Sequence, residues 1–216
     1  MSQIPKTREL FDTTHSLAGK MLDECEYPHE ALPKIKDFII KCQCKLDDSF
    51  KEIKEGVFVA DDAVIWEGAT IMPPTIIGHK TEVRPGAFIR GNALIGDGAV
   101  IGNSTEIKNA IIFDKAQLPH YNYVGDSIIG YCAHMGAGAI ASNLKLNKSE
   151  VIIRSDDEKL ATGLKKVGTF LADHAEVGCN SVLCPGTVIG RGALVYPLST
   201  VIGYVPDGTV HNGKTR

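Results

Sequence analysis

The sequence predicts a mostly β protein whose main part is a parallel β-helix of hexapeptide repeats. From Val59 to Ile107 an aliphatic residue recurs at every sixth position, and a mostly small residue stands two positions before each one. Neither the helical period of about 3.6 nor the strand period of about 2 gives this spacing. A short regular repeat is typical of a solenoid, in which each unit buries its apolar side only against its neighbours. Glycine directly after several of the aliphatic residues suits the tight turns between short strands.

Residues 1–55 precede the repeat and differ from it, being charged, poor in glycine and helical in pattern. Leu17 and Leu22 fit one face of a first helix, and Ile35 and Ile39 fit one face of a second. We expect this segment to form an N-terminal helical cap. It would close the open end of the solenoid or pack against a neighbouring subunit, because the ends of a solenoid have to be covered.

Residues 56–216 form the predicted β-helix domain. The register loosens after Ile107, because Pro119 falls where the repeat requires an aliphatic residue. A second regular ladder begins at Leu171, and the polar residues 154–166 before it predict a loop extruded from the coil wall. A solenoid keeps an irregular stretch where a functional site requires it, so we expect the site in this irregular middle.

The composition narrows the class of protein. The chain has 216 residues and a formal net charge of −3 at pH 7, which gives no reason to expect a nucleic-acid partner. No apolar run is long enough for a membrane span and the first residues lack a signal-peptide core, so we expect a cytoplasmic protein without a membrane partner. The six cysteines are scattered, which favours free thiols over disulfides or a metal site.

His120 is the first candidate for chemistry. It follows a proline and lies off the apolar ladder, so we expect it near the surface, where an imidazole can act as a general base. A surface histidine in a turn, without a catalytic role, is the alternative.

Arg90 and Lys108 are candidate anion ligands. If three hexads make one coil of a triangular solenoid, residues 18 apart stack on one face, and these two residues are 18 apart. Two adjacent cations repel each other, so an anion bound between them would be favourable. Two solvated surface cations are the alternative.

Four segments of the chain resemble the hexapeptide-repeat acyltransferases, in the same order as in that family. They are Arg84-Pro85-Gly86, the run from Gly102 to Ala110, the run from Pro119 to Asp126, and Gly136-Ala137-Gly138 with Asn143. The resemblance is strongest to the C-terminal acetyltransferase domain of the bifunctional N-acetylglucosamine-1-phosphate uridyltransferase/glucosamine-1-phosphate acetyltransferase, without its uridyltransferase half. It implies a left-handed parallel β-helix, a homotrimer with active sites between subunits, and acetyl-CoA as co-substrate.

The resemblance also implies roles for single residues. His120 matches the catalytic base, which takes a proton from the acceptor amine, and Asn143 matches a residue of the catalytic centre that contacts the sugar. Lys108 and Tyr123 match residues that hold the sugar phosphate. Lys148 lies one place short of the family's phosphate-binding lysine.

The phosphate-binding arginine has two candidates. Arg84 carries the family's Arg-Pro-Gly motif, but it precedes Lys108 by 24 residues, one hexad more than a coil. An extra hexad turns a residue onto another face of a three-sided solenoid. Arg90, 18 residues before Lys108, therefore takes the vacated place by geometry.

The chain departs from the family at three positions. His134 stands where the family has an asparagine near the acceptor, and Cys179 stands where a serine helps to hold acetyl-CoA. Pro197 falls near an alanine of the same cleft. We assign His134 to the acceptor site, and Ala137, Cys179 and Pro197 to the acetyl-CoA site.

The sequence thus predicts an acyl-CoA (acetyl-CoA) dependent N-acyltransferase that acts on an amino-sugar phosphate or a nucleotide sugar. The three departures keep a second interpretation open, a non-catalytic sugar-nucleotide-binding or scaffold protein of the same fold. A γ-class carbonic anhydrase shares the solenoid, but its zinc site needs two histidines five apart, which the sequence lacks.

Overall fold

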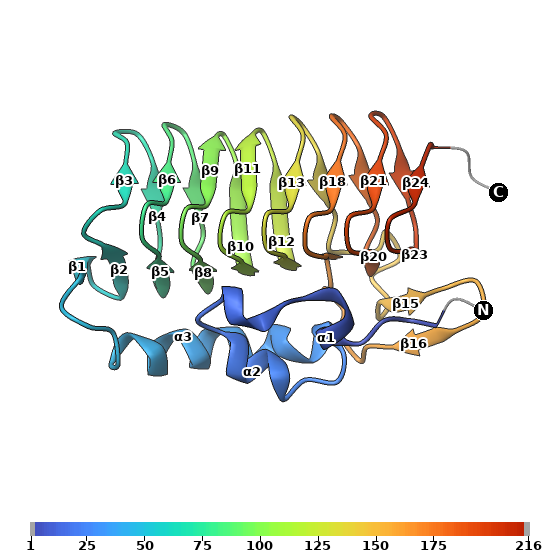
Figure 1. Cartoon of the computed structure of the whole chain (residues 1–216), viewed down its shortest axis with the longest axis horizontal. Coiled ribbons are helices and arrows are strands. Elements are labelled where there is room, and N and C mark those ends of the chain that lie inside the picture. The colour runs from blue at the N-terminus through green and yellow to red at the C-terminus, as the bar shows by residue number, and fades with distance from the viewer. Residues whose placement is uncertain (1–2, 214–216) are drawn as a thin grey trace.

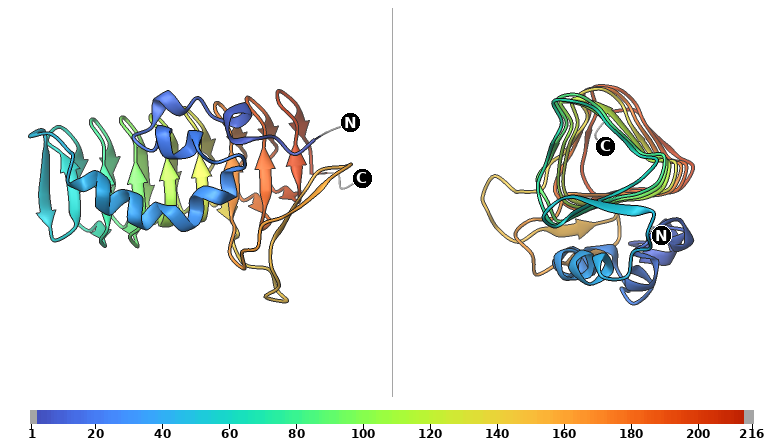
Figure 2. Two further views of the ribbon diagram at one scale, coloured as in Figure 1. Left: turned by 90° about the horizontal axis from the view of Figure 1, so that it is seen from below. Right: turned by 90° about the vertical axis from the view of Figure 1, so that its left-hand side faces the viewer.

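The computed structural model describes residues 3–213. They form a solenoid of short parallel strands with a triangular cross-section, and the N-terminal helices lie along one of its sides (Figures 1 and 2). The repeat therefore predicts the parallel β-helix correctly.

Each full coil contributes strand residues to three faces, here named A, B and C. Face A contains β2 (Val57–Ala60), β5 (Thr75–Ile77), β8 (Ala93–Ile95), the last parts of β10 (Glu106–Ile112) and β12 (Tyr123–Ile129), β17 (Thr169–Leu171), β20 (Thr187–Ile189) and β23 (Tyr204–Val205). Face B contains β3 (Val64–Ile65), β6 (Glu82–Val83), β9 (Val100–Asn103), β11 (Gln117–His120), β13 (His134–Met135), β18 (Glu176–Val177), β21 (Leu194–Val195) and β24 (Val210–His211). Face C contains β4 (Thr70–Ile71), β7 (Phe88–Ile89), the first parts of β10 and β12, β14 (Ile140–Ala141), β19 (Val182–Leu183) and β22 (Thr200–Val201).

The inward-facing aliphatic residues of the repeat form the core of the coil. Ile77, Ile89, Ile95, Ile101 and Ile107 are all fully buried. Burying a side chain of this size stabilises the fold by about 1.5–3 kcal/mol, so the ladder accounts for much of the stability. The glycines after the ladder residues serve close approach of the coils: a Cβ on Gly96 would lie 2.6 Å from the backbone nitrogen of Asp114 in the next coil.

The middle of the solenoid is regular, contrary to the expected loss of register. Ile101 pairs with Leu118, and Ile107 pairs with Val124, so these coils are 17 residues long instead of 18. One residue is missing at the corner between faces C and A. Leu118 therefore takes the inward place, and Pro119 turns outward.

An excursion interrupts the coil between Asn143 and Val167, whose backbone groups are joined by a hydrogen bond of 3.0 Å. It contains a hairpin of β15 (Ile152–Arg154) and β16 (Lys159–Ala161), which pair antiparallel. The excursion thus begins about ten residues earlier than the extruded loop expected at 154–166, and part of it is regular strand.

The N-terminal segment consists of α1 (Thr7–Leu10), η1 (Thr13–His15), α2 (Gly19–Asp23), η2 (Pro28–Lys34) and α3 (Ile35–Gln43). It covers the outside of face A instead of the end of the solenoid, which corrects the expected position of the cap (Figure 2). The end is flanked by β1 (Phe50–Lys54), which pairs antiparallel with β2. Among the described residues no helix is long and apolar enough to cross a membrane.

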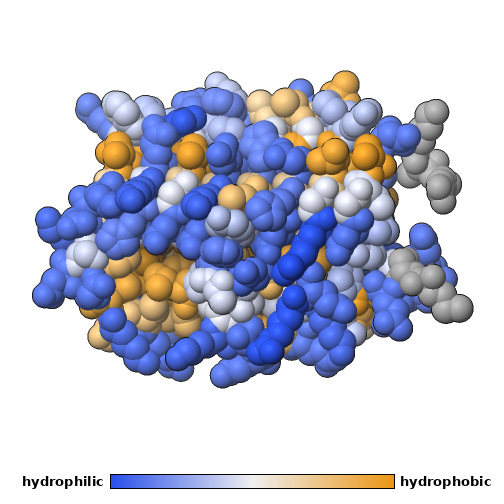
Figure 3. Space-filling model, in the orientation of Figure 1, coloured by the Kyte–Doolittle hydropathy of each residue, from blue (hydrophilic) through white to orange (hydrophobic). Residues whose placement is uncertain are grey.

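Face A accepts this cover because its outward residues are apolar as well as its inward ones. The outward series is Phe58, Ile76, Leu94, Ile111, Ile128, Phe170, Val188 and Tyr204. Six of the eight are buried, against a helical segment that contributes Leu10, Phe11 and Leu22. Figure 3 shows face B above and the edge of the helical segment below; much of this surface is hydrophilic, and an apolar patch lies where α3 meets the first coils.

Candidate active site

Face C carries the two predicted anion ligands in neighbouring coils. The backbone N–H of Arg90 donates to the carbonyl of Ile107, so Arg90 and Lys108 project side by side. Each also has an acidic partner: Arg90 Nη1 lies 2.6 Å from Glu106 Oε1, and Lys108 Nζ lies 3.9 Å from Asp126 Oδ2. Their mutual repulsion is therefore partly relieved within the chain. Both side chains remain accessible, at 40% and 28% exposure.

A ladder of short polar side chains runs along the corner between faces C and A. Asn109 Nδ2 donates to Asp126 Oδ1 at 2.9 Å, and Asn143 Nδ2 donates to Asp126 Oδ2 at 2.6 Å, each across a separation of 17 residues. The backbone of Asn109 and Asp126 is left-handed there, with φ of 49° and 48°, a conformation that Asn and Asp tolerate better than other non-glycine residues. Asp126 is nearly buried, and it holds Asn143 in place.

Tyr123, in the same coil as Asp126, and Asn143, in the next coil, close the cluster. A Cβ on Gly125 would lie 2.6 Å from Tyr123 Oη and 2.7 Å from Asn143 Nδ2, so glycine leaves room for both groups. Burial raises the pKa of Tyr123, and the carboxylates of Glu106 and Asp126 add to the shift. The phenol therefore stays protonated at neutral pH and is available as a hydrogen-bond donor. We name Arg90, Glu106, Lys108, Tyr123, Asp126 and Asn143 the face C cluster.

His120 lies at the corner between faces B and C, three residues before Tyr123. Its backbone N–H donates to Asn122 Oδ1 at 3.2 Å, and its carbonyl accepts from Gly138 N–H at 3.0 Å. Asn122 is buried and anchors the turn through Nδ2, which donates to the carbonyl of Gly136 at 2.8 Å. The His120 ring is exposed and has no hydrogen-bond partner among residues 3–213, so the turn is fixed while the imidazole is free to meet a ligand.

The three residues assigned to acetyl-CoA stack along this same corner. Asn180 N–H donates to the carbonyl of Ala137, and Leu198 N–H donates to the carbonyl of Cys179, both at 2.9 Å. Cys179 and Pro197 are exposed. The structure thus lines up Ala137, Cys179 and Pro197 in successive coils toward the C-terminus, beside the coil that carries His120.

Arg84 and His134 lie on face B and not with Lys108. Arg84 Nη2 pairs with Glu82 Oε2 at 2.9 Å, a contact that lowers the pKa of Glu82, and Trp66 Nε1 donates to the same carboxylate. His134 Nδ1 lies 2.8 Å from Glu176 Oε2. Within one chain, neither side chain joins the face C cluster.

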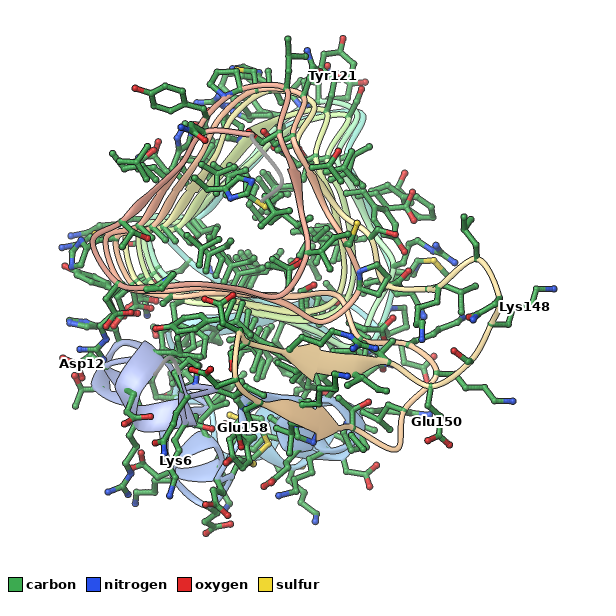
Figure 4. All side chains as sticks on the ribbon, turned by 90° about the vertical axis from the view of Figure 1, so that its right-hand side faces the viewer. Lys6, Asp12, Tyr121, Lys148, Glu150 and Glu158 are labelled. Carbon is green, nitrogen blue, oxygen red and sulfur yellow. The ribbon has the colours of Figure 1, made fainter. Side chains whose placement is uncertain are left out.

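Lys148 also lies apart from the cluster. It is exposed on the excursion, where its backbone N–H donates to the carbonyl of Lys145, and Figure 4 shows its side chain pointing into solvent.

Asp126, Asn109, Glu106 and Asn122 were not recognised in the sequence. The spacing of 17 between Asn109, Asp126 and Asn143 was a usable signal, but it becomes visible only once the coil length is known.

In the part of the chain that the structure describes, one group of side chains elsewhere has metal-ligand character. It consists of Asp61, Asp62 and His79 at the first corner between faces A and B. Both ring nitrogens of His79 already have partners, Asp62 Oδ1 at 2.9 Å and Ser49 Oγ at 3.1 Å. This arrangement ties β1 to the first coils and needs no ion.

Comparison with known proteins identifies relatives of this architecture. The family model of the GMPPB C-terminal domain matches residues 71–157. A bifunctional sugar-1-phosphate nucleotidylyltransferase/acetyltransferase of Sulfurisphaera tokodaii is 33% identical over 162 residues, which cover 74% of this chain and 40% of the relative. The uncharacterized acetyltransferase YaiX of Escherichia coli O6:K15:H31 is 31% identical over 176 residues, which cover 82% of this chain and 75% of the relative.

The chain spans less than half the length of the bifunctional relatives, including the GlmU protein of Methanococcus maripaludis, of which 42% is covered at 31% identity. Among solved structures, a mutant of the N-acyltransferase AntD of Bacillus cereus, in complex with dTDP and coenzyme A, matches 76% of this chain and 86% of its own, with 19% identity and a TM-score of 0.40. The acetyltransferase domain of PglB from Neisseria gonorrhoeae, in complex with acetyl coenzyme A, matches 74% and 57%, with 16% identity and a TM-score of 0.34.

Proposed function

Because this chain belongs to the hexapeptide-repeat acetyltransferases, we propose that it transfers an acetyl group from acetyl-CoA to the amine of a phosphorylated amino sugar. The acceptor is an amino-sugar phosphate or a nucleotide sugar. The single observation that carries this proposal is the face C cluster, which places two accessible cations beside polar side chains that can hydrogen-bond a sugar, next to the corner that presents His120.

The chemistry requires a base near the acceptor nitrogen. The amine nitrogen attacks the thioester carbonyl carbon, a C–N bond forms, the C–S bond breaks, and CoA leaves as its thiol. His120 takes the proton that the amine loses and passes it to the departing sulfur, and the exposed imidazole is suited to this role. Arg90 and Lys108 bind the phosphate, and Tyr123 and Asn143 hydrogen-bond the sugar.

We also propose that the chain forms a homotrimer with the active site between subunits. Face A is already covered by the chain's own helices, so faces B and C remain for contact. Face B exposes large apolar side chains at both ends: Val64, Trp66, Leu194, Tyr196 and Val210. Burying such groups favours association. A trimer would bring face B of one subunit, with Arg84 and His134, toward the corner of the next.

Release of CoA thiol from acetyl-CoA, measured across a panel of amino-sugar phosphates and nucleotide amino sugars, tests the activity. We expect His120→Ala to lower the transfer rate by about 100-fold or more, with an unchanged circular dichroism spectrum. His174→Ala is the matched control, because His174 is exposed at the corner between faces A and B.

Equal rates in the His120→Ala variant and the parent would refute the assigned base. Binding of the sugars without thiol release for any of them would identify a non-catalytic binding protein instead. Light scattering at micromolar concentration tests the trimer, and a monomer there would contradict a shared active site.

A further inference from the structure

A pocket of about 170 Å³ lies between the excursion and the C-terminal coils. Its walls are Lys145, Ile152, Arg154, Cys184, Pro185, Ile202 and Gly203. Cys184 and Ile202 are outward residues of face C directly after β19 and β22, and the remaining walls come from the hairpin strand β15, the start of the excursion and the corner between faces C and A. We name this space the hairpin pocket.

Two corner glycines allow the hairpin to approach the coils closely. A Cβ on Gly203, whose φ is +86°, would lie 2.9 Å from the carbonyl oxygen of Arg154. A Cβ on Gly186, at φ +80°, would lie 2.7 Å from Val151 Cγ1. The pocket is therefore a defined product of the local sequence and of the packing of β15 on β20.

The hairpin pocket is cationic, and no carboxylate among residues 3–213 pairs with its charges. Lys145 Nζ donates to the backbone carbonyl of Glu150 at 3.2 Å, a neutral acceptor. Arg154 and Lys145 have no carboxylate partner among residues 3–213. Glu158, on the same hairpin, directs its carboxylate to the N–H of Ile4 at 3.0 Å. Two like charges that face one partly enclosed space repel each other, which favours an anion between them.

We propose that the hairpin pocket binds a phosphate group of a small molecule, as a second anion site distinct from Arg90 and Lys108. The arginine fork contacts two phosphate oxygens, the lysine supplies a further charge, and the apolar walls fit the less polar part of the ligand. The pocket volume is well above what a single water molecule needs.

The pocket and the face C cluster share one surface. Lys108 and Cys184 both follow an inward ladder residue on face C, and three steps between coils separate them. At about 4.8 Å per step this is roughly 14 Å, much more than the separation of the two phosphorus atoms of one diphosphate, so the two sites would hold separate phosphate groups. Two sources of phosphate are therefore to be distinguished: the diphosphate of a nucleotide ligand, and free inorganic phosphate.

Alkylation of Cys184 provides a direct readout of occupancy, because this thiol lines the pocket. Burial raises its pKa, so the reaction is run at mildly alkaline pH with a neutral reagent and followed by peptide mass spectrometry. Cys44 is exposed at the C-terminal end of α3, outside every site described above, and serves as the internal control. The probes are a nucleoside diphosphate and inorganic phosphate, each tested alone.

We expect a saturating probe to slow alkylation of Cys184 about tenfold and to leave the alkylation rate of Cys44 unchanged. Arg154→Gln with Lys145→Gln should weaken probe binding about tenfold or more by calorimetry, as expected for the loss of charged hydrogen bonds. Lys165→Gln removes an exposed cation of the same excursion outside the pocket and should have no effect. Protection by the nucleotide alone assigns the site to a nucleotide ligand, and protection by phosphate alone assigns it to the free anion.

Unchanged affinity in the folded double variant, or protection of Cys184 that persists in it, would overturn the proposal. No protection of Cys184 by either probe would overturn it as well. These measurements need no turnover, so their outcome is independent of whether the acetyl transfer proposed above takes place.

Discussion

Arg90 and Arg84 form a matched pair for locating the acceptor phosphate. Each follows an inward ladder residue, and each is paired with a glutamate, Arg90 with Glu106 at 2.6 Å and Arg84 with Glu82 at 2.9 Å. Their side chains are similarly exposed, at 40% and 34%. The two arginines differ in the face that carries them, because Arg90 projects from face C beside Lys108 and Arg84 projects from face B.

The expected loss of sugar-phosphate affinity in Arg90→Ala follows from the exposure of Arg90 and from its ion pair with Glu106. A charged hydrogen bond to phosphate is about twice as strong as a neutral one, but solvent screens an exposed cation. Arg90 also has to share its fork with Glu106. We therefore expect Arg90→Ala to weaken binding of a sugar phosphate about tenfold, and Arg84→Ala to change it less than about twofold.

Calorimetric titration of both variants with glucosamine phosphate, at low and at moderate salt, is the assay. The effect of Arg90→Ala should shrink as ionic strength rises, because the Debye length falls to about 8 Å at 0.15 M. Arg90→Lys keeps the charge without the fork and should lie between the parent and the alanine variant. A larger loss at Arg84→Ala would show that the Arg-Pro-Gly motif, and not the position in the coil, locates the phosphate.

Three further predictions concern the corner ladder and the N-terminal segment. Asp126→Asn leaves one of the two neighbouring asparagine amides without a hydrogen-bond acceptor. We therefore expect the free energy of unfolding to fall by about 1–3 kcal/mol and the KM for the acceptor sugar to rise. An unchanged KM would mean that Asn143 needs no support from Asp126. Phe11→Ala removes a buried ring 5.3 Å from that of Phe113 and should cost about 3–5 kcal/mol in urea unfolding, whereas a loss below about 1 kcal/mol would speak against tight packing of the segment on face A. Burial lowers the pKa of His29, so the unfolded chain binds its proton first and stability falls as the pH drops below about 6.5. His29→Phe should therefore flatten the decline of Tm between about pH 7.5 and 5.5. Parallel curves of Tm against pH for the variant and the parent would contradict this reasoning.

The hexad spacing was sufficient to predict the coil, because the aliphatic residue of each hexad is the one that points into the core. The place of the helical segment was not predicted, although the sequence contains a usable sign of it. Pairs such as Ile76-Ile77, Leu94-Ile95 and Ile111-Ile112 are apolar on both sides of face A. A strand that is buried on both sides has to be covered from outside, and the N-terminal segment provides most of that cover, with Val151 and Ile153 of the excursion adding to it.

The site could be predicted in part. Coil arithmetic placed Arg90 with Lys108 and Arg84 on another face, as the structure has them. The arithmetic failed after Ile107, because a coil shortened by one residue moves every later position. The hydrogen bonds of Asp126 to both asparagines depend on this shortened corner, which hexads of constant length cannot represent.

The position of the N-terminal segment also bears on how the molecule unfolds. In a bare solenoid each coil contacts only its neighbours, so terminal coils fray and unfolding spreads along the axis. Here Gln43 Nε2 donates to the carbonyl of Gly56 in the first coil, while Arg191 Nε donates to the carbonyl of Leu10 near the last coils. The N-terminal segment thus connects the first coils of the solenoid to the last ones. We expect one cooperative transition in denaturant, and amide hydrogen exchange that is similarly slow from the first coils to those around Ile189.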